Sequence, residues 1–283
     1  MAKIAYLGPE KTFTEQAARI MFPEAQPSAL IPIQPIRNVI RSVDTNNAEY
    51  AVVPIENFYN GEVRQTLDSL IECSKAKIVS EKSFEIVHCL GALQNHATIK
   101  QILSKDQALE QCSVYICKKY PNALEISTTS TSEAARIVKD ESRLNAAVIA
   151  SESALKSYGL EIIEKDICPN NKTRFIAVGK YTPKQTGDDK TFLAIHPSID
   201  RSGILSDISS AFKLFGINLE YFQSRPDGKK GYIFYAELEG HQEELHVAKA
   251  IDSVKYALDP KNKFPDTIKI LGSYKNTHWK NED

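Results

Sequence analysis

A hydroxyl and a guanidinium precede a short apolar run near the middle of the chain. Residues 170–179 read NNKTRFIAVG, so Thr173 and Arg174 stand directly before Phe175 and three further apolar residues. The run has the length of a buried strand, and Gly179 ends it. The ends of strands are where α/β proteins place binding groups, and a guanidinium can hold a carboxylate through two parallel hydrogen bonds. The alternative is a threonine that merely suits a strand and an arginine in a structural ion pair.

A second polar pair ends another apolar run. Residues 50–57 read YAVVPIEN, which places Glu56 and Asn57 at the C-terminal end of a predicted buried strand. Side chains of a cleft lie at such strand ends in α/β proteins. Gly61 permits a tight turn before a helix-like segment, whose N-terminus would favour a bound anion.

Hydroxyl side chains gather at a third position. Residues 128–132 read TTSTS and precede a predicted helix over 131–140, so one of them is expected to cap that helix. Thr12 and Glu15 have the spacing of a capping box at the start of a predicted helix over 12–22.

Predicted strands and helices alternate as far as residue 180. This order indicates an α/β fold with largely parallel strand pairing. The expected strands cover residues 3–8, 50–57, 76–93 (one or two strands) and the segment from 146, and the expected helices cover 12–22, 61–72 and 131–140.

The pattern changes after a polar segment at 180–190, which has the composition of a linker. The remaining segments predict the order β-α-β-β-α-β, the ferredoxin-like plan. Its first helix, over 203–216, presents apolar residues on one face and ends at Gly216.

Composition excludes several classes of protein. The net charge of −1 gives no basis for binding nucleic acid or an anionic membrane, and no apolar run approaches the roughly 20 residues of a membrane span. The N-terminus lacks the apolar core of a signal peptide, and five cysteines without a Cys-x-x-Cys pair indicate reduced thiols in a cytoplasmic protein. Neither common phosphate-binding motif occurs and the histidines lack metal-ligand spacing, so we expect no cofactor and no metal.

Several segments, in order, resemble the blocks of prephenate dehydratase. They are YLGPEKTFTEQAA, YAVVPIENFYNGEVRQTLDSL, STTSTSEAARIV, AVIASESALKSYGL and NKTRFIAVG. In the C-terminal part, SGILSDISSAF and INLEYFQSRP resemble two blocks of the ACT domains that are fused to that enzyme. The resemblance covers nearly the whole chain.

The resemblance implies a two-lobed α/β catalytic part like type II periplasmic binding proteins, plus a ferredoxin-like α+β ACT domain. Prephenate would bind between the lobes and lose carbon dioxide and water to give phenylpyruvate in phenylalanine biosynthesis, and L-phenylalanine would inhibit at the ACT domain. The catalytic domain is expected at 1–180, with one lobe at about 1–77 and 164–180 and the other at about 78–163. The ACT domain is expected at 190–275.

The family's Thr-Arg-Phe motif maps onto residues 173–175. It implies that Thr173 donates to the departing hydroxyl, with Glu56 or water sharing the proton, and that Phe175 and Arg174 contact the substrate. Clamping the ring carboxylate would oppose its loss, so we expect Arg174 to hold the pyruvyl carboxylate instead. Because neighbouring strand residues face opposite ways, Thr173 should still lie in the loop before the strand.

Other residues are carried over from the same blocks. Gln107 matches a glutamine of the family, and a surface position on a helix is its open alternative. For Glu152 a purely structural role is an equally open alternative. Lys11, Phe58 and Lys105 depart from the family's usual Gly, Ser and His; the two lysines could attract a dianion or simply be solvated. The remaining expected substrate contacts are Thr12, Asn57, Gly61, Ser130, Thr131 and Ser132.

The expected phenylalanine site lies in the ACT domain at a helix start and on a neighbouring strand. Gln223 stands in place of a glutamate of the family and keeps its hydrogen-bonding capacity. Because ACT domains pair edge to edge, a homodimer or homotetramer is expected. The expected contacts of the effector are Gly203, Ile204, Leu205, Ser224, Arg225 and Pro226.

Three other functions remain open at this stage. An arogenate dehydratase would perform the same chemistry on the aminated substrate. A non-catalytic amino-acid sensor could have kept the two-lobed clamp, although Thr173 argues against it. A decarboxylase that keeps the hydroxyl is disfavoured, because related decarboxylases lack the Thr-Arg-Phe block.

Overall fold

The computed structural model describes residues 2–197, 201–228, 231–259, 261 and 267–277. The chain folds into two units, neither of which is one continuous segment. The first comprises Met1–Val39, Ala51–Thr66 and Lys82–Phe175, and the second comprises Ile40–Tyr50, Leu67–Glu81 and Ile176–Asp283. Five elements cross a boundary between the units: α2 (Ile36–Asp44), β3 (Tyr50–Asn57), α3 (Arg64–Glu72), β5 (Lys77–Glu85) and β11 (Lys172–Gly179).

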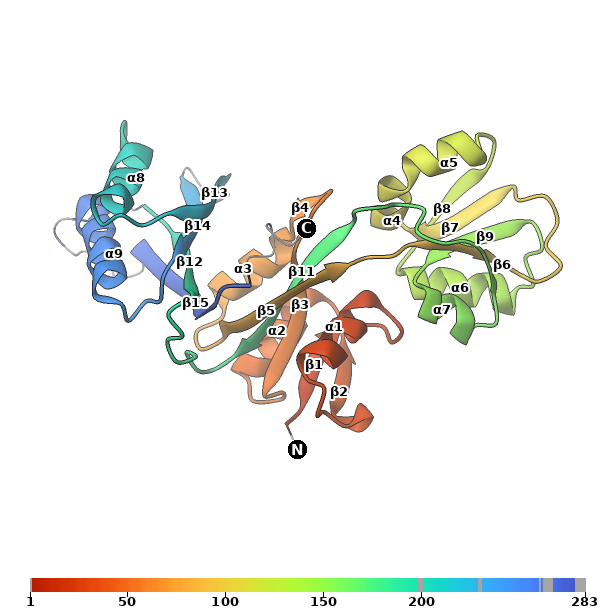
Figure 1. The fold of residues 1–283 in the computed structure, drawn as a ribbon, viewed down its shortest axis with the longest axis horizontal. Helices are drawn as coiled ribbons and strands as arrows, with labels where there is room; N and C mark the ends of the chain where they lie inside the picture. Colours follow the sequence, from red (N-terminus) through yellow and green to blue (C-terminus); the bar gives the residue numbers. More distant parts are fainter. Residues whose placement is uncertain (1, 198–200, 229–230, 260, 262–266, 278–283) are drawn as a thin grey trace. The chain divides into compact units, whose positions relative to one another are not determined.

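The first unit contains two sheets. In one of them the strands are neighbours in the order β11-β3-β1-β2 (Figure 1). Apolar residues form β1 and pair in parallel with β2, with Ile4 opposite Leu30. A short strand folds back antiparallel onto the end of β3 through a tight turn. The elements of this part are β1 (Ile4–Leu7), α1 (Phe13–Met21), the 3₁₀ helix Pro27–Ala29, β2 (Leu30–Ile33), β3 (Tyr50–Asn57) and β4 (Gly61–Glu62).

The second sheet of this unit has five strands in the order β10-β6-β9-β7-β8. Strand β7 is parallel to both its neighbours, whereas β6 is antiparallel to β9 and β10. Its elements are β6 (Cys89–Ala92), β7 (Gln101–Lys105), α4 (Asp106–Gln111), α5 (Ser113–Lys119), β8 (Leu124–Thr128), α6 (Thr131–Asp140), β9 (Ala146–Ala150), α7 (Glu152–Ser157) and β10 (Glu161–Glu164).

Helices cover both faces of the five-stranded sheet. Helices α4 and α5 lie on one face and α6 and α7 on the other (Figure 1). Side chains of the central strands alternate accordingly: Ile102 packs with the α4 side and Leu103 with the α6 side. Strand β9 reads AAVIA without polar positions because both of its faces are buried.

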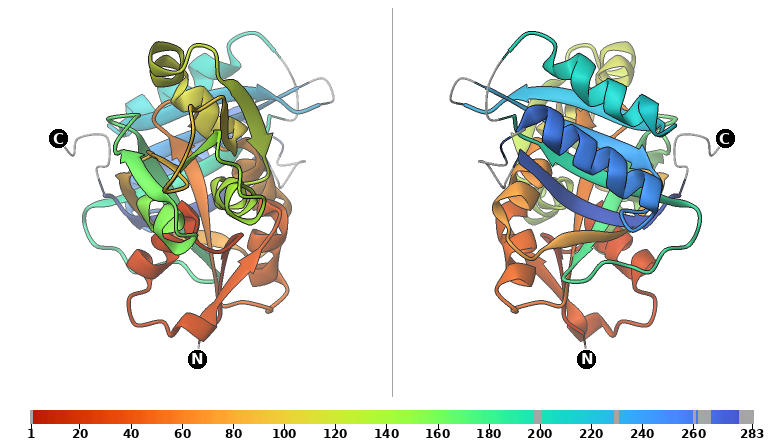
Figure 2. Two further views of the ribbon diagram at one scale, coloured as in Figure 1. Left: turned by 90° about the vertical axis from the view of Figure 1, so that its right-hand side faces the viewer. Right: turned by 90° about the vertical axis from the view of Figure 1, so that its left-hand side faces the viewer.

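The second unit contains the predicted β-α-β-β-α-β order, which is confirmed. Its strands are neighbours in the order β13-β14-β12-β15, and α8 and α9 lie side by side on one face (Figure 2). Ile208, Phe212, Val247 and Val254 from these helices fill the core against the sheet. The elements are β12 (Asp189–Ile195), α8 (Ile204–Leu214), β13 (Leu219–Pro226), β14 (Tyr232–Glu239), α9 (Leu245–Leu258) and β15 (Ile268–Lys275).

All five cysteines are free thiols, and four of them are buried; Cys117 is exposed. Within the described ranges, no helix is both long enough and apolar enough to cross a membrane.

Candidate active site

A cavity of about 330 Å³ lies in the first unit. Both sheets of the unit and the segments that connect them contribute to its wall. Seven expected site residues line it: Thr12, Asn57, Gln107, Ser130, Thr131, Thr173 and Phe175. The other lining residues are Leu7, Gly8, Phe13, Thr14, Gln34, Pro35, Ile36, Pro54, Val63, Gln65, Ile86, His88, Lys105, Ala108, Gln111 and Thr129.

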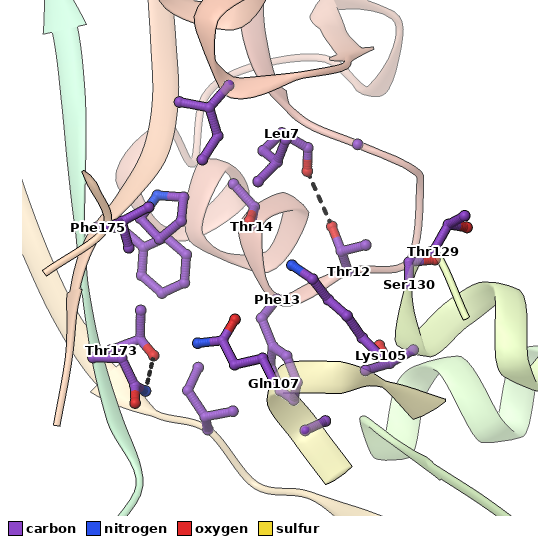
Figure 3. Close-up of a pocket in the computed structure, with 18 of the residues that line it drawn as sticks. Leu7, Thr12, Phe13, Thr14, Lys105, Gln107, Thr129, Ser130, Thr173 and Phe175 are labelled. Carbon is purple, nitrogen blue, oxygen red and sulfur yellow. Dashed lines mark hydrogen bonds between the residues drawn. The ribbon is translucent and has the colours of Figure 1, made fainter. Parts of the chain in front are cut away.

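Thr173 is the second residue of strand β11, so the expectation that it lies in a loop is wrong. Strand alternation then gives Thr173 and Phe175 the same side of the strand and Arg174 the opposite side. Thr173 and Phe175 both line the cavity (Figure 3). The ring of Phe175 is held by parallel stacking on Phe84, with 4.8 Å between the ring centroids.

The Asn57 side chain donates a hydrogen bond to the Thr173 hydroxyl. Its amide nitrogen lies 2.8 Å from Thr173 Oγ1 and 2.8 Å from Asn171 Oδ1. All three side chains are more than nine-tenths buried. Because Thr173 Oγ1 accepts the hydrogen bond from Asn57, the hydroxyl hydrogen remains available to donate to a ligand in the cavity.

Gln111 is a site residue that the sequence reasoning missed. Its amide nitrogen donates to Asn57 Oδ1 at 3.0 Å, and its oxygen accepts from Asn171 Nδ2 at 2.9 Å. Gln107, which was predicted, also lines the cavity and lies one helical turn earlier on α4. Their spacing of four residues places both on one face of a helix, and this is the signal that could have identified Gln111.

Arg174 and Glu56 pair with each other on the side of the strand away from Thr173. Arg174 Nη2 lies 3.0 Å from Glu56 Oε2, and the arginine side chain is 1% exposed. Neither residue is part of the cavity wall. The structure thus places both side chains outside the cavity wall, and the predicted contact of Arg174 with a substrate carboxylate and the predicted share of Glu56 in the proton transfer stay predictions. The physical reason for this placement is the alternation of side chains along β11 and β3.

Cationic and hydroxyl groups form another part of the cavity wall. Lys105 extends into the space beside Thr12 and Ser130, and Gln107 extends toward Phe175 (Figure 3). Although much of Lys105 is accessible to solvent, desolvation by the concave wall lowers the pKa of its ammonium, an effect that Asp106 opposes. Ser130 caps α6, as predicted for one of the TTSTS hydroxyls, by accepting from the Glu133 N–H at 3.0 Å.

Thr12 and Lys11 form the start of α1. Thr12 caps the helix by accepting from the Glu15 N–H, as the sequence predicts, and its own hydroxyl donates to Pro9 O at 3.1 Å. Lys11 lies outside the cavity wall, with its ammonium 4.4 Å from the ring centroid of Tyr158. Its φ of 65° is a conformation that favours glycine.

The other predicted substrate contacts lie outside the cavity wall. Gly61 has a φ of 71° and closes the turn between β3 and β4. Ser132 donates to Lys11 O at 3.0 Å, and Phe58 is 63% exposed. Glu152 is held by Lys156 and Lys165 at the surface, a structural arrangement.

The expected effector residues lie in two places in the second unit. Gly203 caps α8 with a φ of 88°, a conformation that favours glycine, and Ile204 and Leu205 begin the helix. Ser224 and Pro226 are exposed on β13. Arg225, between them, forms an ion pair with Asp68 of α3 and lies 3.3 Å from the Tyr235 hydroxyl.

This fold and this pocket define an α/β protein with two sheets around a cavity of mixed apolar and polar lining, and with a ferredoxin-like domain. Residues 4–183 match the model of the prephenate dehydratase family, and residues 198–255 match the model of the ACT domain. The chain belongs to the prephenate dehydratase family and carries an ACT domain. The predicted fold class, the resemblance and the enzyme class, a hydro-lyase acting on prephenate, are confirmed by these matches and by curated relatives.

Two curated relatives and one solved structure illustrate the similarity. The chain is 38% identical over 277 residues to the bifunctional chorismate mutase/prephenate dehydratase of Aquifex aeolicus, covering 96% of this chain and 73% of that protein. It is 34% identical over 283 residues to the prephenate dehydratase of Lactococcus lactis subsp. cremoris, covering 96% and 97%. The prephenate dehydratase of Arthrobacter aurescens in complex with L-Phe is 30% identical, with a TM-score of 0.82 over 97% of this chain and 90% of that one.

Proposed function

We propose that the cavity around Thr173 binds prephenate and that the Thr173 hydroxyl assists departure of the ring hydroxyl. One observation carries the assignment: Thr173 Oγ1 accepts from Asn57, which leaves its hydrogen to donate into the cavity. Prephenate is a dianion that becomes aromatic when it loses its ring carboxylate and ring hydroxyl, so the reaction has a large driving force. The enzyme has to orient the substrate and stabilise the departing oxygen.

The bond changes balance with one added proton. The bond between the ring and its carboxylate breaks, and that electron pair enters the ring as carbon dioxide leaves. The ring then expels its hydroxyl with the electrons of the carbon–oxygen bond, and a proton converts it to water. An aliphatic alcohol is a weak acid, so Thr173 stabilises the developing hydroxide by a hydrogen bond, and the buffered solvent supplies the net proton.

Carboxylate binding is assigned to the cationic part of the wall. The Lys105 ammonium, the hydroxyls of Ser130 and Thr131 and the N-terminus of α6 are grouped in the cavity wall and all favour an anion. The pyruvyl carboxylate is placed there because it keeps its charge throughout the reaction. A cation against the ring carboxylate would stabilise the ground state and oppose its loss.

The test compares the natural chain with Thr173→Val, which replaces the hydroxyl by a methyl group of similar size. The natural chain is expected to form phenylpyruvate from prephenate, and the variant is expected to lose about 100-fold or more in kcat. Undiminished kcat in a folded Thr173→Val would refute the role of the hydroxyl. Rates with arogenate, measured side by side, decide between the two substrates, and faster turnover of arogenate would overturn the assignment of prephenate.

Regulation by L-phenylalanine is proposed at the ACT domain. It is supported by the matched ACT model and by the similar Arthrobacter aurescens structure, which is a complex with L-Phe. The N-terminus of α8, which follows Gly203, suits the amino acid's carboxylate. The proposed effector contacts are Gly203, Ile204, Leu205, Ser224, Arg225 and Pro226. Of these, Arg225 forms an ion pair with Asp68 in this structure.

Assembly into a homodimer or homotetramer is also proposed. Strand β13 lies at one end of its sheet, where an unpaired strand edge can join the same edge of a second copy. A cytoplasmic location is proposed from the free cysteines, four of which are buried. Sedimentation of the purified chain at several concentrations would test the assembly.

A further inference from the structure

His88 is a buried titratable residue of the cavity wall to which the proposed reaction assigns no role. It is 3% exposed, and its ring meets the ring of Phe13 edge to face at 5.5 Å between centroids. Its Nε2 atom lies 3.0 Å from Gln111 Oε1. His88 is connected to Thr173 by hydrogen bonds through Gln111 and Asn57. The direction of each of these hydrogen bonds indicates the role of His88.

Backbone donors fix the orientation of the Asn57 amide. Asn57 Oδ1 lies 3.0 Å from the backbone nitrogen of Tyr59 and 3.1 Å from that of Asn60. A backbone N–H can only donate, so this atom of Asn57 must be the oxygen. The other atom is therefore the nitrogen, and it must donate to Thr173 Oγ1 and Asn171 Oδ1.

The orientation of Asn57 fixes that of Gln111. The Gln111 atom that faces Asn57 Oδ1 at 3.0 Å must be a donor, so it is the amide nitrogen. Gln111 Oε1 then faces Asn171 Nδ2 and His88 Nε2, and it accepts from both. His88 must therefore carry its hydrogen on Nε2.

A second observation agrees with this tautomer. No hydrogen-bond partner of the buried His88 Nδ1 is found in the part of the chain that the structure describes, so a hydrogen on Nδ1 would be buried without an acceptor. Burial also lowers the pKa of His88, against smaller opposing effects of Gln111 and Asp166, which favours the neutral ring.

We propose that His88 is a positioning residue for the dehydration, whose Nε2–H locks the Gln111 amide and, through Asn57, the Thr173 hydroxyl. Without that donor, Gln111 Oε1 keeps only the bond from Asn171, while its nitrogen still donates to Asn57 and Asn60. The Gln111 side chain is then held by one hydrogen bond fewer and can shift. A shift of Gln111 weakens its hydrogen bond to Asn57 Oδ1 and so loosens the support of the Thr173 hydroxyl. This inference rests on the proposed role of Thr173.

The experiment compares three variants that differ in where an N–H can be placed. The amide nitrogen of His88→Gln occupies nearly the place of Nε2, so this variant is expected to keep kcat within about threefold of the natural chain. The amide nitrogen of His88→Asn corresponds to Nδ1 and cannot reach Gln111. This variant and His88→Leu are expected to lose about 10- to 100-fold in kcat, with KM for prephenate nearly unchanged.

Thermal melting of each variant separates positioning from folding, and His88→Gln is the matched control. The proposal is overturned if folded His88→Asn and His88→Leu keep full kcat, or if His88→Gln is as impaired as they are. Thr173→Val is measured in the same assay. Full activity in Thr173→Val would refute the proposed function, whereas the order of the His88 variants tests only this inference.

Discussion

At the scale of single residues, neutral hydrogen bonds dominate the reacting end of the cavity. The Thr173 hydroxyl accepts from the Asn57 amide, which in turn is bonded to the side chains of Asn171 and Gln111. The ion pair of Arg174 and Glu56 lies on the other side of the strand. Because a cation beside the ring carboxylate would oppose decarboxylation, this separation suits the reaction. The cation that lines the cavity, Lys105, is grouped with the hydroxyls of Ser130 and Thr131.

The role of Lys105 predicts a pH dependence of substrate binding. The ammonium attracts the dianion only while protonated, and desolvation lowers its pKa. KM for prephenate should therefore rise as pH increases, beginning below the range usual for lysine. Lys105→Arg should remove this rise because a guanidinium stays charged. Lys105→Met should have a raised KM at low pH that the natural chain approaches only as Lys105 loses its proton. A KM of the natural chain equal to that of Lys105→Met across the range would contradict the assignment.

At the scale of elements, strand alternation and helix spacing decide which side chains meet in the cavity. β11 begins at Lys172, and this start sends Thr173 into the cavity and Arg174 away from it. Gln107 and Gln111 lie four residues apart on helix α4, so both side chains are on one face of the helix and line the cavity. In the second unit, β15 meets β5 at one parallel pair, Gly272 and Ile78, where the two backbones approach closely.

The close approach at Gly272 predicts a stability effect. A methyl group there would lie 2.7 Å from Ile78 Cβ and 2.9 Å from Ile78 N, so the strands would have to separate. Gly272→Ala is expected to lower the free energy of unfolding by about 1–3 kcal/mol. At Gly231 the nearest atoms to an added methyl group belong to the end of the Asp227 side chain. Gly231→Ala should therefore change the free energy of unfolding by less than about 0.5 kcal/mol. Urea denaturation of both variants is the measurement, and equal effects would refute the explanation.

At the scale of the whole molecule, β5 and α3 connect the ACT domain with the cavity along the chain. β5 contacts the ACT domain through Ile78 and Glu81 and leads to His88 in the cavity wall. α3 carries Gln65 in that wall, and one turn later Asp68 pairs with Arg225. β5 and α3 therefore each carry residues that contact the ACT domain and lead along the chain to residues of the cavity wall.

The buried ion pair between Lys190 and Glu81 holds β5 to the ACT domain. Lys190 Nζ lies 2.7 Å from Glu81 Oε1, and both side chains are fully buried. Lys190→Met would leave the buried Glu81 carboxylate without this cation and with hydrogen bonds from Thr277, so we expect a loss of about 3–5 kcal/mol in the free energy of unfolding. The double variant Lys190→Met with Glu81→Met should recover most of this loss, as judged by chemical denaturation. A double variant no more stable than the single one would be inconsistent with this account.

The sequence by itself determined the alternation of elements, the ferredoxin-like order, the helix caps at Thr12 and Ser130 and the motif that contains Thr173, because these depend on local periodicity and spacing. Tertiary structure alone decided that β11 starts one residue before Thr173, that Arg174 pairs with Glu56, and that His88 and Gln111 join Asn57 beside the hydroxyl. These facts depend on strand register and on contacts between residues at least 23 positions apart, and local sequence patterns carry no information about either.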